Sequence, residues 1–171
     1  MAQVSDPGAD TIRFERFYDA SIEDVWALWT TKEGLEEWYA PEGMHVEILA
    51  LELRVGGAFE QVMTAVGADQ VAYLANANMS TTARVSGRFV ELVHHRRLRI
   101  RFDIDFVPGV ESYPYEMMVE LSTECGRVQM IVTTDRHPDR EMTRGAVLGL
   151  TSQLQRFDLA IAARATMERR R

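Results

Sequence analysis

Two adjacent histidines could contribute ligands to a metal site. His94 and His95 would supply two of the four ligands that a zinc site needs. Adjacent strand residues point to opposite faces of a sheet, so we expect that the two imidazoles cannot share one ion. His45 and His137 stand beside turn residues and are expected at the surface, and Cys125 is the only cysteine. We therefore predict no metal site.

The glycine pair Gly56-Gly57 is a candidate for phosphate binding, because glycine-rich turns can cradle phosphate groups. The pair lies between two predicted strands rather than before a helix, and neither Lys-Ser nor Lys-Thr follows it. We interpret the glycines as a tight hairpin or bulge, with a positive φ at one of them at least. No cofactor is predicted.

Carboxylates are plentiful, and paired carboxylates are the usual means of general acid–base catalysis. Asp103 and Asp105 fall on the polar face of their strand, where we expect them to be solvated partners of Arg99 and Arg101. No serine or cysteine has a neighbouring base at a recognisable spacing. We predict no catalytic residue and expect a protein that is not an enzyme, with an enzyme as the alternative. The same solvated position is expected for Glu60, Glu116 and Glu120.

Composition indicates one ordinary globular domain, since the 171 residues are 46% hydrophobic and 26% charged. The net charge of −7 argues against nucleic acid as a partner, because that binding needs clustered cations. No stretch approaches the roughly 20 apolar residues that span a bilayer. We expect a cytoplasmic protein without a membrane partner, with a flexible N-terminus over residues 1–10 and a single domain over residues 11–171.

The hydrophobic period predicts one strand, two short helices, six further strands and one long helix. The first strand covers Thr11 to Tyr18, Ser21 caps the first helix with Asp24 in the capping box, and a second short helix surrounds Leu35 to Trp38. Six strands without a long helix between them favour antiparallel pairing. These strands are predicted at Val46 to Leu53, Ala58 to Ala65, Arg84 to Val93, Arg97 to Phe106, Tyr115 to Ser122 and Val128 to Thr134.

The last helix is predicted from about Asp139 to Met167, which is roughly 40 Å at 1.5 Å per residue. It is long enough to cover the apolar face of the sheet, with Leu154 and Phe157 buried and Arg156 and Arg164 exposed. The fold class is therefore α+β, with a curved antiparallel sheet of about seven strands packed on a long C-terminal helix and two short helices after strand one. Its apolar stripe comprises Val147, Leu150, Leu154, Phe157 and Ile161.

Several motifs cover the chain from about Thr11 to Ile161. They are Asp19 to Trp29, Trp38-Tyr39-Ala40-Pro41-Glu42-Gly43, Leu53-Arg54-Val55-Gly56-Gly57-Ala58-Phe59 and Gly87 to Leu92. Together they resemble the START-like (SRPBCC, helix-grip) superfamily, and within it the homologues of the activator of the heat-shock chaperone ATPase. The sequence departs from that pattern at Gly149-Leu150, where the family has Gly-Trp, and in a longer segment from Gly67 to Ser80, which we interpret as a lid or a surface loop.

The resemblance implies a cavity between the sheet and the long helix, which we expect to hold at least about 300 Å³ and one small hydrophobic or aromatic molecule. Gln61 and Tyr115 are expected to orient that ligand through hydrogen bonds. Periodicity alone favours an ordinary close-packed core, and the resemblance is what favours a cavity. The predicted ligand-binding residues are Trp38, Phe59, Gln61, Met63, Phe89, Phe102, Tyr115, Met117, Leu150, Leu154 and Phe157.

Two alternatives follow from the same resemblance. One is an enzyme similar to polyketide cyclases and aromatases, which would need an inward acid or base with a shifted pKa. The other is a co-chaperone that stimulates a heat-shock ATPase. The expected partners are accordingly a small apolar molecule, with a chaperone or a second copy of the chain as alternatives.

Overall fold

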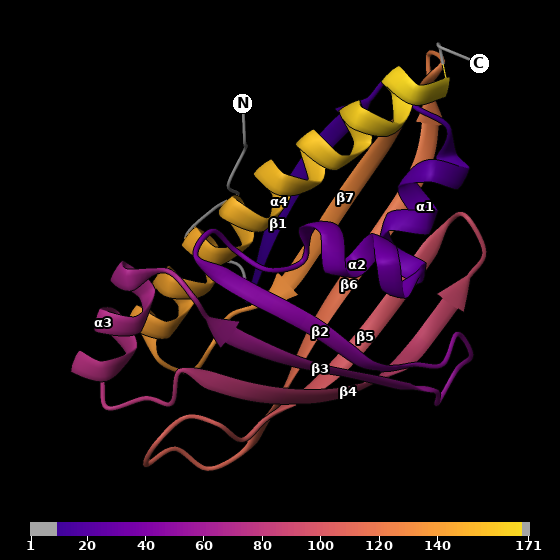
Figure 1. Cartoon of the computed structure of the whole chain (residues 1–171). Coiled ribbons are helices and arrows are strands. Elements are labelled where there is room, and N and C mark those ends of the chain that lie inside the picture. Colours follow the sequence, from indigo (N-terminus) through magenta and orange to yellow (C-terminus); the bar gives the residue numbers. More distant parts are fainter. Residues whose placement is uncertain (1–9, 169–171) are drawn as a thin grey trace.

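The computed structural model describes residues 10–168 as one curled, seven-stranded sheet with a long helix across its inner face (Figure 1). All neighbouring strands are antiparallel, in the order β1-β7-β6-β5-β4-β3-β2. The predicted flexible N-terminus, residues 1–10, lies outside the described residues except for Asp10. The elements are β1 (Thr11–Tyr18), α1 (Ile22–Thr30), α2 (Lys32–Trp38), β2 (Met44–Leu51), β3 (Ala58–Ala65), α3 (Ala68–Asn76), β4 (Thr82–Val93), β5 (Arg97–Ile104), β6 (Tyr113–Glu124), β7 (Arg127–Asp135) and α4 (Arg140–Glu168).

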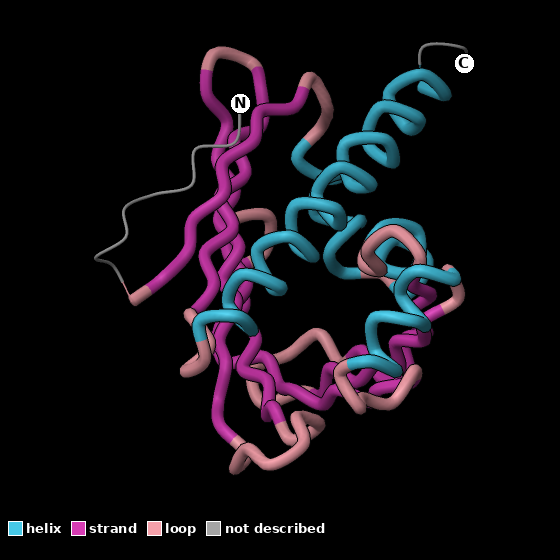
Figure 2. Tube along the Cα trace, turned by 90° about the vertical axis from the view of Figure 1, so that its left-hand side faces the viewer, coloured by secondary structure: helices cyan, strands magenta, loops and turns pink. Residues whose placement is uncertain are grey.

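This arrangement confirms the predicted α+β helix-grip architecture. Figure 2 shows the strands curving around one side of α4, so the sheet has an inner face toward the helix and an outer face away from it. Strand β5 illustrates how the sequence selects these faces, because Leu98, Ile100 and Phe102 are buried while Arg101 and Asp103 are exposed. Within residues 10–168, no helix combines the length and hydropathy needed to cross a membrane.

Helices α1 and α2 follow β1 and begin at side-chain caps. The Ser21 hydroxyl oxygen accepts a hydrogen bond from the backbone N–H of Asp24 at 3.1 Å, and the Thr31 hydroxyl accepts one from Gly34 at 3.0 Å. Gly34 also lets the two helices approach, because a Cβ there would lie 2.6 Å from the carbonyl oxygen of Ala27. The indole of Trp38 donates to the Leu28 carbonyl at 2.9 Å, which ties α2 to α1 inside the core.

Helix α4 is fastened to the C-terminal end of α2 by polar side chains. Arg156 donates to the carbonyl of Ala40 at 2.7 Å, and Gln153 donates to the carbonyl of Tyr39. Arg164 pairs with Glu37 at 3.3 Å. The prediction that Arg156 and Arg164 are exposed is therefore wrong. Both are half-buried, because their aliphatic stems lie along the protein while their guanidinium groups reach α2.

The segment from Gly67 to Ser80, which we interpret from the sequence as a lid or a surface loop, contains the short helix α3. None of the α3 side chains is buried, and Tyr73 is 68% exposed. The helix is joined to the start of β2 by the backbone, since the N–H groups of Val66 and Gly67 both donate to the carbonyl of Gly43 at 2.9 Å. Helix α3 therefore stands at the surface, beside the end of the sheet that β3 and β4 form (Figure 1).

Strand β2 is one edge of the sheet, and α2 covers its middle with two side chains. The ammonium group of Lys32 donates to the Ile48 carbonyl at 2.6 Å, and the carboxylate of Glu36 accepts from the Ile48 N–H at 2.9 Å. The two side chains also form an ion pair with each other at 2.8 Å. Both edge-facing backbone groups of Ile48 thus have hydrogen-bond partners and are not available to pair with a strand of another molecule.

The hairpin between β2 and β3 contains the glycine pair. Gly56 has a φ of 80°, which confirms the prediction of a positive φ at one of the two positions. Gly57 is required for a different reason, since a Cβ there would collide with the Glu52 carbonyl oxygen. The pair therefore serves the backbone of a tight turn, in which the Gly57 N–H donates to the Arg54 carbonyl at 2.8 Å.

Candidate functional site

The inner face of the sheet is the candidate site, because the eleven predicted ligand-binding residues all lie between it and the helices. Ten of them are buried, and Met63 is half-buried. They divide into two groups, a closed end and an open end. The closed end comprises Trp38, Phe59, Phe89, Leu154 and Phe157, and the open end comprises Gln61, Met63, Phe102, Tyr115 and Leu150. The remaining residue, Met117, is paired with Ile100 in the row of Phe89 and so lies on the side of the closed end.

The closed end is a packed aromatic core. None of its five residues has surface accessible to a water-sized probe. The ring centroids of Trp38 and Phe157 are 4.8 Å apart, and those of Phe59 and Phe89 are 6.1 Å apart, both edge to face. The lining of a cavity would expose surface to such a probe, so no void of ligand size borders these side chains in this structure.

The open end begins one step further along the strands. The register aligns Phe59, Gly87, Phe102 and Tyr115 across four neighbouring strands. Beyond this row burial falls at some inner-face positions: along β4, Phe89 is fully buried and Val85 is half-buried, whereas Ile104 on β5 stays buried. The half-buried apolar residues that pack against the core on this side are Met63, Val85, Tyr113 and Val147.

Gln61 is the one buried amide on the inner face of the open end. Its side chain is 4% exposed, and its carbonyl oxygen Oε1 has no hydrogen-bond partner among the described residues. Two tyrosines, Tyr39 and Tyr115, are further polar side chains of the interior. Burial raises the pKa of the Tyr39 phenol, and burial also raises the pKa of the Tyr115 phenol, against a hydrogen bond with Thr134 that lowers it. Both phenols are therefore neutral hydrogen-bonding groups.

A histidine at the open end was not predicted. The imidazole of His137 lies flat against the Tyr115 ring, with centroids 4.5 Å apart and planes at 8°, and its Nδ1 is 2.6 Å from the Tyr113 hydroxyl. The sequence predicts His137 at the surface, but it is half-buried against the tyrosine rings, and its backbone N–H donates to the Thr143 hydroxyl of α4 at 3.0 Å. Burial lowers the pKa of His137, with Asp135 acting in the opposite direction. The spacing of Tyr113 and Tyr115, two residues apart on one strand, is the signal that could have indicated this cluster.

The histidine pair differs from the prediction as well. His94 and His95 do not point to opposite faces, because they lie in the turn after β4, where His95 has a φ of 57°. Their rings are stacked with centroids 3.8 Å apart, and both meet the Trp26 ring edge to face. Among residues 10–168, no group of three or more histidine, cysteine, aspartate or glutamate side chains is placed to hold a metal ion.

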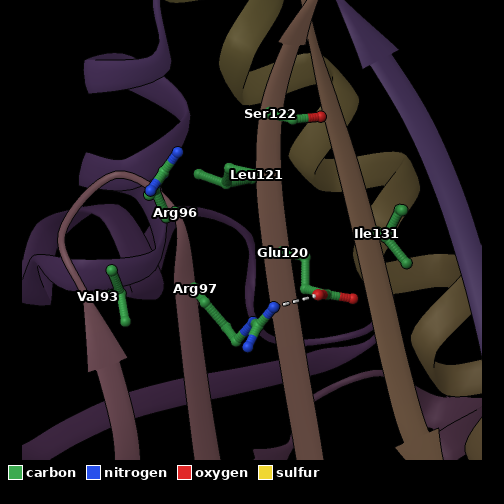
Figure 3. A pocket seen from close by; sticks show the side chains of 7 residues that line it. All are labelled: Val93, Arg96, Arg97, Glu120, Leu121, Ser122 and Ile131. Carbon is green, nitrogen blue, oxygen red and sulfur yellow. Dashed lines mark ion pairs between the residues drawn. The ribbon is translucent and has the colours of Figure 1, made fainter.

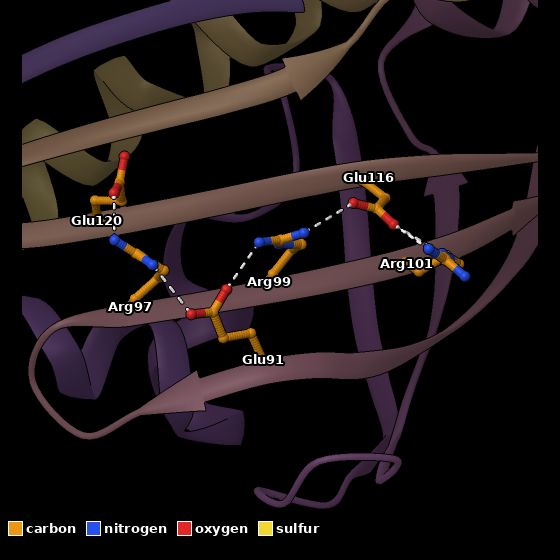
Figure 4. A network of polar contacts seen from close by, with 6 residues as sticks. All are labelled: Glu91, Arg97, Arg99, Arg101, Glu116 and Glu120. Carbon is orange, nitrogen blue, oxygen red and sulfur yellow. Dashed lines mark hydrogen bonds and ion pairs between the residues drawn. The ribbon is translucent and has the colours of Figure 1, made fainter.

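The outer face of the sheet carries a ladder of ion pairs (Figure 4). Arg99 pairs with Glu91 at 2.9 Å and with Glu116 at 3.7 Å. The prediction that Asp103 and Asp105 are the partners of Arg99 and Arg101 is therefore wrong, because cross-strand neighbours lie closer than residues two apart on one strand. The remaining contacts of the ladder join Arg97 to Glu91 and Glu120, and Arg101 to Glu116.

Five surface hollows of about 210 to 500 Å³ lie away from the predicted site. The one of about 500 Å³ is on the sheet beside the turn between β4 and β5, where Arg96, Arg97 and Glu120 line it with apolar neighbours (Figure 3). None of the five is lined by any of the eleven predicted residues. The expected cavity of at least about 300 Å³ is thus not among them, and the open end is the part of the predicted site with accessible apolar surface.

Comparisons with solved structures agree with this fold. A protein from Chromobacterium violaceum has a TM-score of 0.73 and 22% identity, and the match covers 89% of this chain and 96% of the other. A protein from Arthrobacter aurescens has a TM-score of 0.73 and 20% identity, covering 93% and 90%. The AHSA1 protein from Silicibacter pomeroyi has a TM-score of 0.68 and 21% identity, covering 92% and 99%.

No curated protein matches the chain. One family model does match, over residues 19–162, and its description is activator of Hsp90 ATPase homolog 1-like protein. This range contains every residue of the closed and open ends, together with the hairpin glycines and most of α4. The chain therefore belongs to the family of activator of Hsp90 ATPase homolog 1-like (AHSA1) proteins.

Proposed function

We propose that this protein binds a small hydrophobic or aromatic molecule at the open end of its inner sheet face. The observation that carries the proposal is the fall in burial along the inner face. Phe59 and Phe89 are fully enclosed, whereas Met63 and Val85 on the same two strands are half-buried. Apolar side chains that continue a core and are still accessible offer favourable contacts to an apolar ligand.

The residue types at the open end suit such a ligand. Met63 is a flexible, polarisable side chain that adapts to different shapes. Phe102 and Tyr115 stand side by side on β5 and β6 and offer aromatic rings. Leu150 is a buried residue of α4, at the position where the sequence motif of the related family has tryptophan. A shorter side chain at this position leaves more room between helix and sheet.

Substitution of Leu150 tests the proposal. We expect an apolar dye whose fluorescence responds to its environment to bind saturably to the wild-type protein, with an affinity nearly independent of salt because apolar burial drives it. Leu150→Trp should weaken that binding severalfold while the protein stays folded by circular dichroism. The matched control is Leu148→Trp, since Leu148 is on the same helix and 68% exposed. No saturable uptake by the wild type, or equal effects of both variants, would contradict the proposal.

Catalysis is a second candidate, and the contact between Tyr113 and His137 favours it. A neutral, half-buried imidazole beside a phenol is a pair of groups able to move a proton. Native mass spectrometry of protein purified from its own host should identify a retained molecule. Incubation of that molecule with the wild type and with His137→Gln then separates the two functions, because an unchanged mass in both samples means binding alone. A chaperone or a second copy of the chain as partner stays a prediction.

A further inference from the structure

The buried carbonyl oxygen of Gln61 is the feature that the fold itself does not explain. Buried polar atoms in proteins nearly always have a hydrogen-bond partner, because an unpaired one has lost its water without a replacement. Gln61 Oε1 has none among the described residues. Its neighbours across the sheet are Ile48 on β2 and Val85 on β4, and neither has a polar side chain. A missing donor must therefore come from outside the sheet.

The side chains next to Gln61 in the sheet are apolar, and one of them, Phe59, belongs to an aromatic cluster. Phe59 and Met63 flank it on the same face of β3, two residues away in each direction. The ring of Phe59 meets Tyr39 at a centroid distance of 5.9 Å and Phe102 at 5.6 Å. The amide oxygen is thus an unpaired acceptor two residues from an aromatic cluster. A flat aromatic molecule with one polar group matches this arrangement.

The phenols of Tyr113 and Tyr115 already have hydrogen-bond partners of their own. Tyr115 shares a hydrogen bond with Thr134, and the Tyr113 hydroxyl is 2.6 Å from His137. A charged ammonium would need a carboxylate for compensation, and the open end as defined contains none. A neutral hydroxyl or N–H group is the donor that fits, since a carbonyl oxygen offers only lone pairs.

We propose that the ligand is a small aromatic alcohol or aromatic N–H compound, and that its donor group hydrogen-bonds to Gln61 Oε1. This inference rests on the proposed function, because it names the chemistry of the molecule bound at the open end. It assigns Gln61 as the residue that selects between ligands of the same shape, while the apolar residues supply contacts that do not depend on the polar group.

A pair of probes with the same ring system tests the inference. 2-Naphthol has a hydroxyl donor, and 2-methoxynaphthalene has the same rings but no donor. We expect the wild-type protein to bind 2-naphthol about two to ten times more tightly in fluorescence titrations, which is the range for one net hydrogen bond. Gln61→Met keeps the length of the side chain without its acceptor and should abolish the difference. Gln155→Met, at an exposed position of α4, should preserve it.

The outcomes separate this inference from the proposed function. Equal binding of both probes by the wild type, tighter binding of the ether, or an unchanged preference in Gln61→Met would overturn the donor inference and leave apolar binding intact. Binding of neither probe would overturn both. Stability supplies a second readout: Gln61→Met should not destabilise the protein, whereas Gln153→Met should, because it leaves the Tyr39 carbonyl without its partner. A clear loss of stability in Gln61→Met would also overturn the inference.

Discussion

Phe157→Ala should be among the most destabilising single substitutions in this protein. The ring has no accessible surface and meets Tyr18, Trp29 and Trp38 at centroid distances of 5.4, 6.0 and 4.8 Å. Its removal exposes or empties roughly 150 Å² of apolar surface, which at about 25 cal/mol per Å² amounts to about 4 kcal/mol of unfolding free energy. Measured Phe→Ala substitutions in packed cores fall at about 3 to 5 kcal/mol.

Urea unfolding, followed by circular dichroism at equilibrium, measures this loss. Val147→Ala is the matched comparison, because Val147 is on the same helix and on the same apolar stripe but is half-buried at the open end. We expect Val147→Ala to cost about 1 kcal/mol, since fewer methyl groups leave a partly accessible site. The ratio between the two losses then reports the difference in packing between the closed and the open end.

A small loss of unfolding free energy in Phe157→Ala would refute the division of the interior into a closed and an open end. If Phe157→Ala cost less than about 1 kcal/mol, the ring would face solvent or an existing void, contrary to the packing that surrounds it. Equal losses for Phe157→Ala and Val147→Ala would show that both ends are packed alike. In that case the accessible apolar surface at Met63 and Val85 would no longer single out a binding site.

Substitutions at two further positions test the backbone conformation of Gly56 and the contribution of His137 to the pH dependence of stability. Gly56→Val should lower the free energy of unfolding by about 1 to 2 kcal/mol, measured by thermal or urea unfolding, because Gly56 has a φ of 80°. The space around a Cβ at Gly56 is empty, so the loss comes from the backbone conformation, and Gly56→Asn should cost less. Equal losses in the two variants would mean that steric contact matters instead. Burial lowers the pKa of His137, so the unfolded chain binds this proton more readily and stability should fall as the pH drops below about 6.5. The same series in His137→Gln should be flatter between pH 7.5 and 5.5; parallel curves would show that His137 is not responsible.

Much of the fold is predictable because the alternation of buried and solvated side chains determines where the strands lie. Residues of β1 and β3 alternate between a dry and a wet face, and their predicted bounds agree with the structure to the residue. The long helix agrees to within one residue at each end. The ends of some strands differ from the prediction. Strand β6 extends two residues further on each side, because backbone pairing with β5 and β7 continues after the apolar alternation stops.

The site could be predicted only as a set of inward-facing residues. Alternation shows that Phe59 and Met63 share a face, but it does not show that one is enclosed and the other half-buried. That difference depends on where α4 crosses the curled sheet, which is set by contacts between distant segments, such as Arg156 with Ala40. His137 was missed for the same reason, since its partner Tyr113 is 24 residues away.

Helix α3 shows a different limit of the sequence pattern. Its nine residues bury no side chain, so packing against the core does not distinguish this helix from a surface loop within the segment from Gly67 to Ser80. The turn that contains His94 and His95 could not be predicted from the alternation of side chains along a strand either. A left-handed residue at the second position, His95, brings two neighbours to the same side, and a period-two pattern contains no information about such a residue.

The protection of edge strand β2 depends on the only lysine in the sequence. Lys32 is 50% exposed while its ammonium group holds the Ile48 carbonyl and the Glu36 carboxylate. Acetylation or an amine-reactive label at this lysine would remove the positive charge from both contacts at once. The carboxylate would then face a strand edge with a free carbonyl beside it. Side-chain amine chemistry on this protein therefore has a single target, and that target is a structural one.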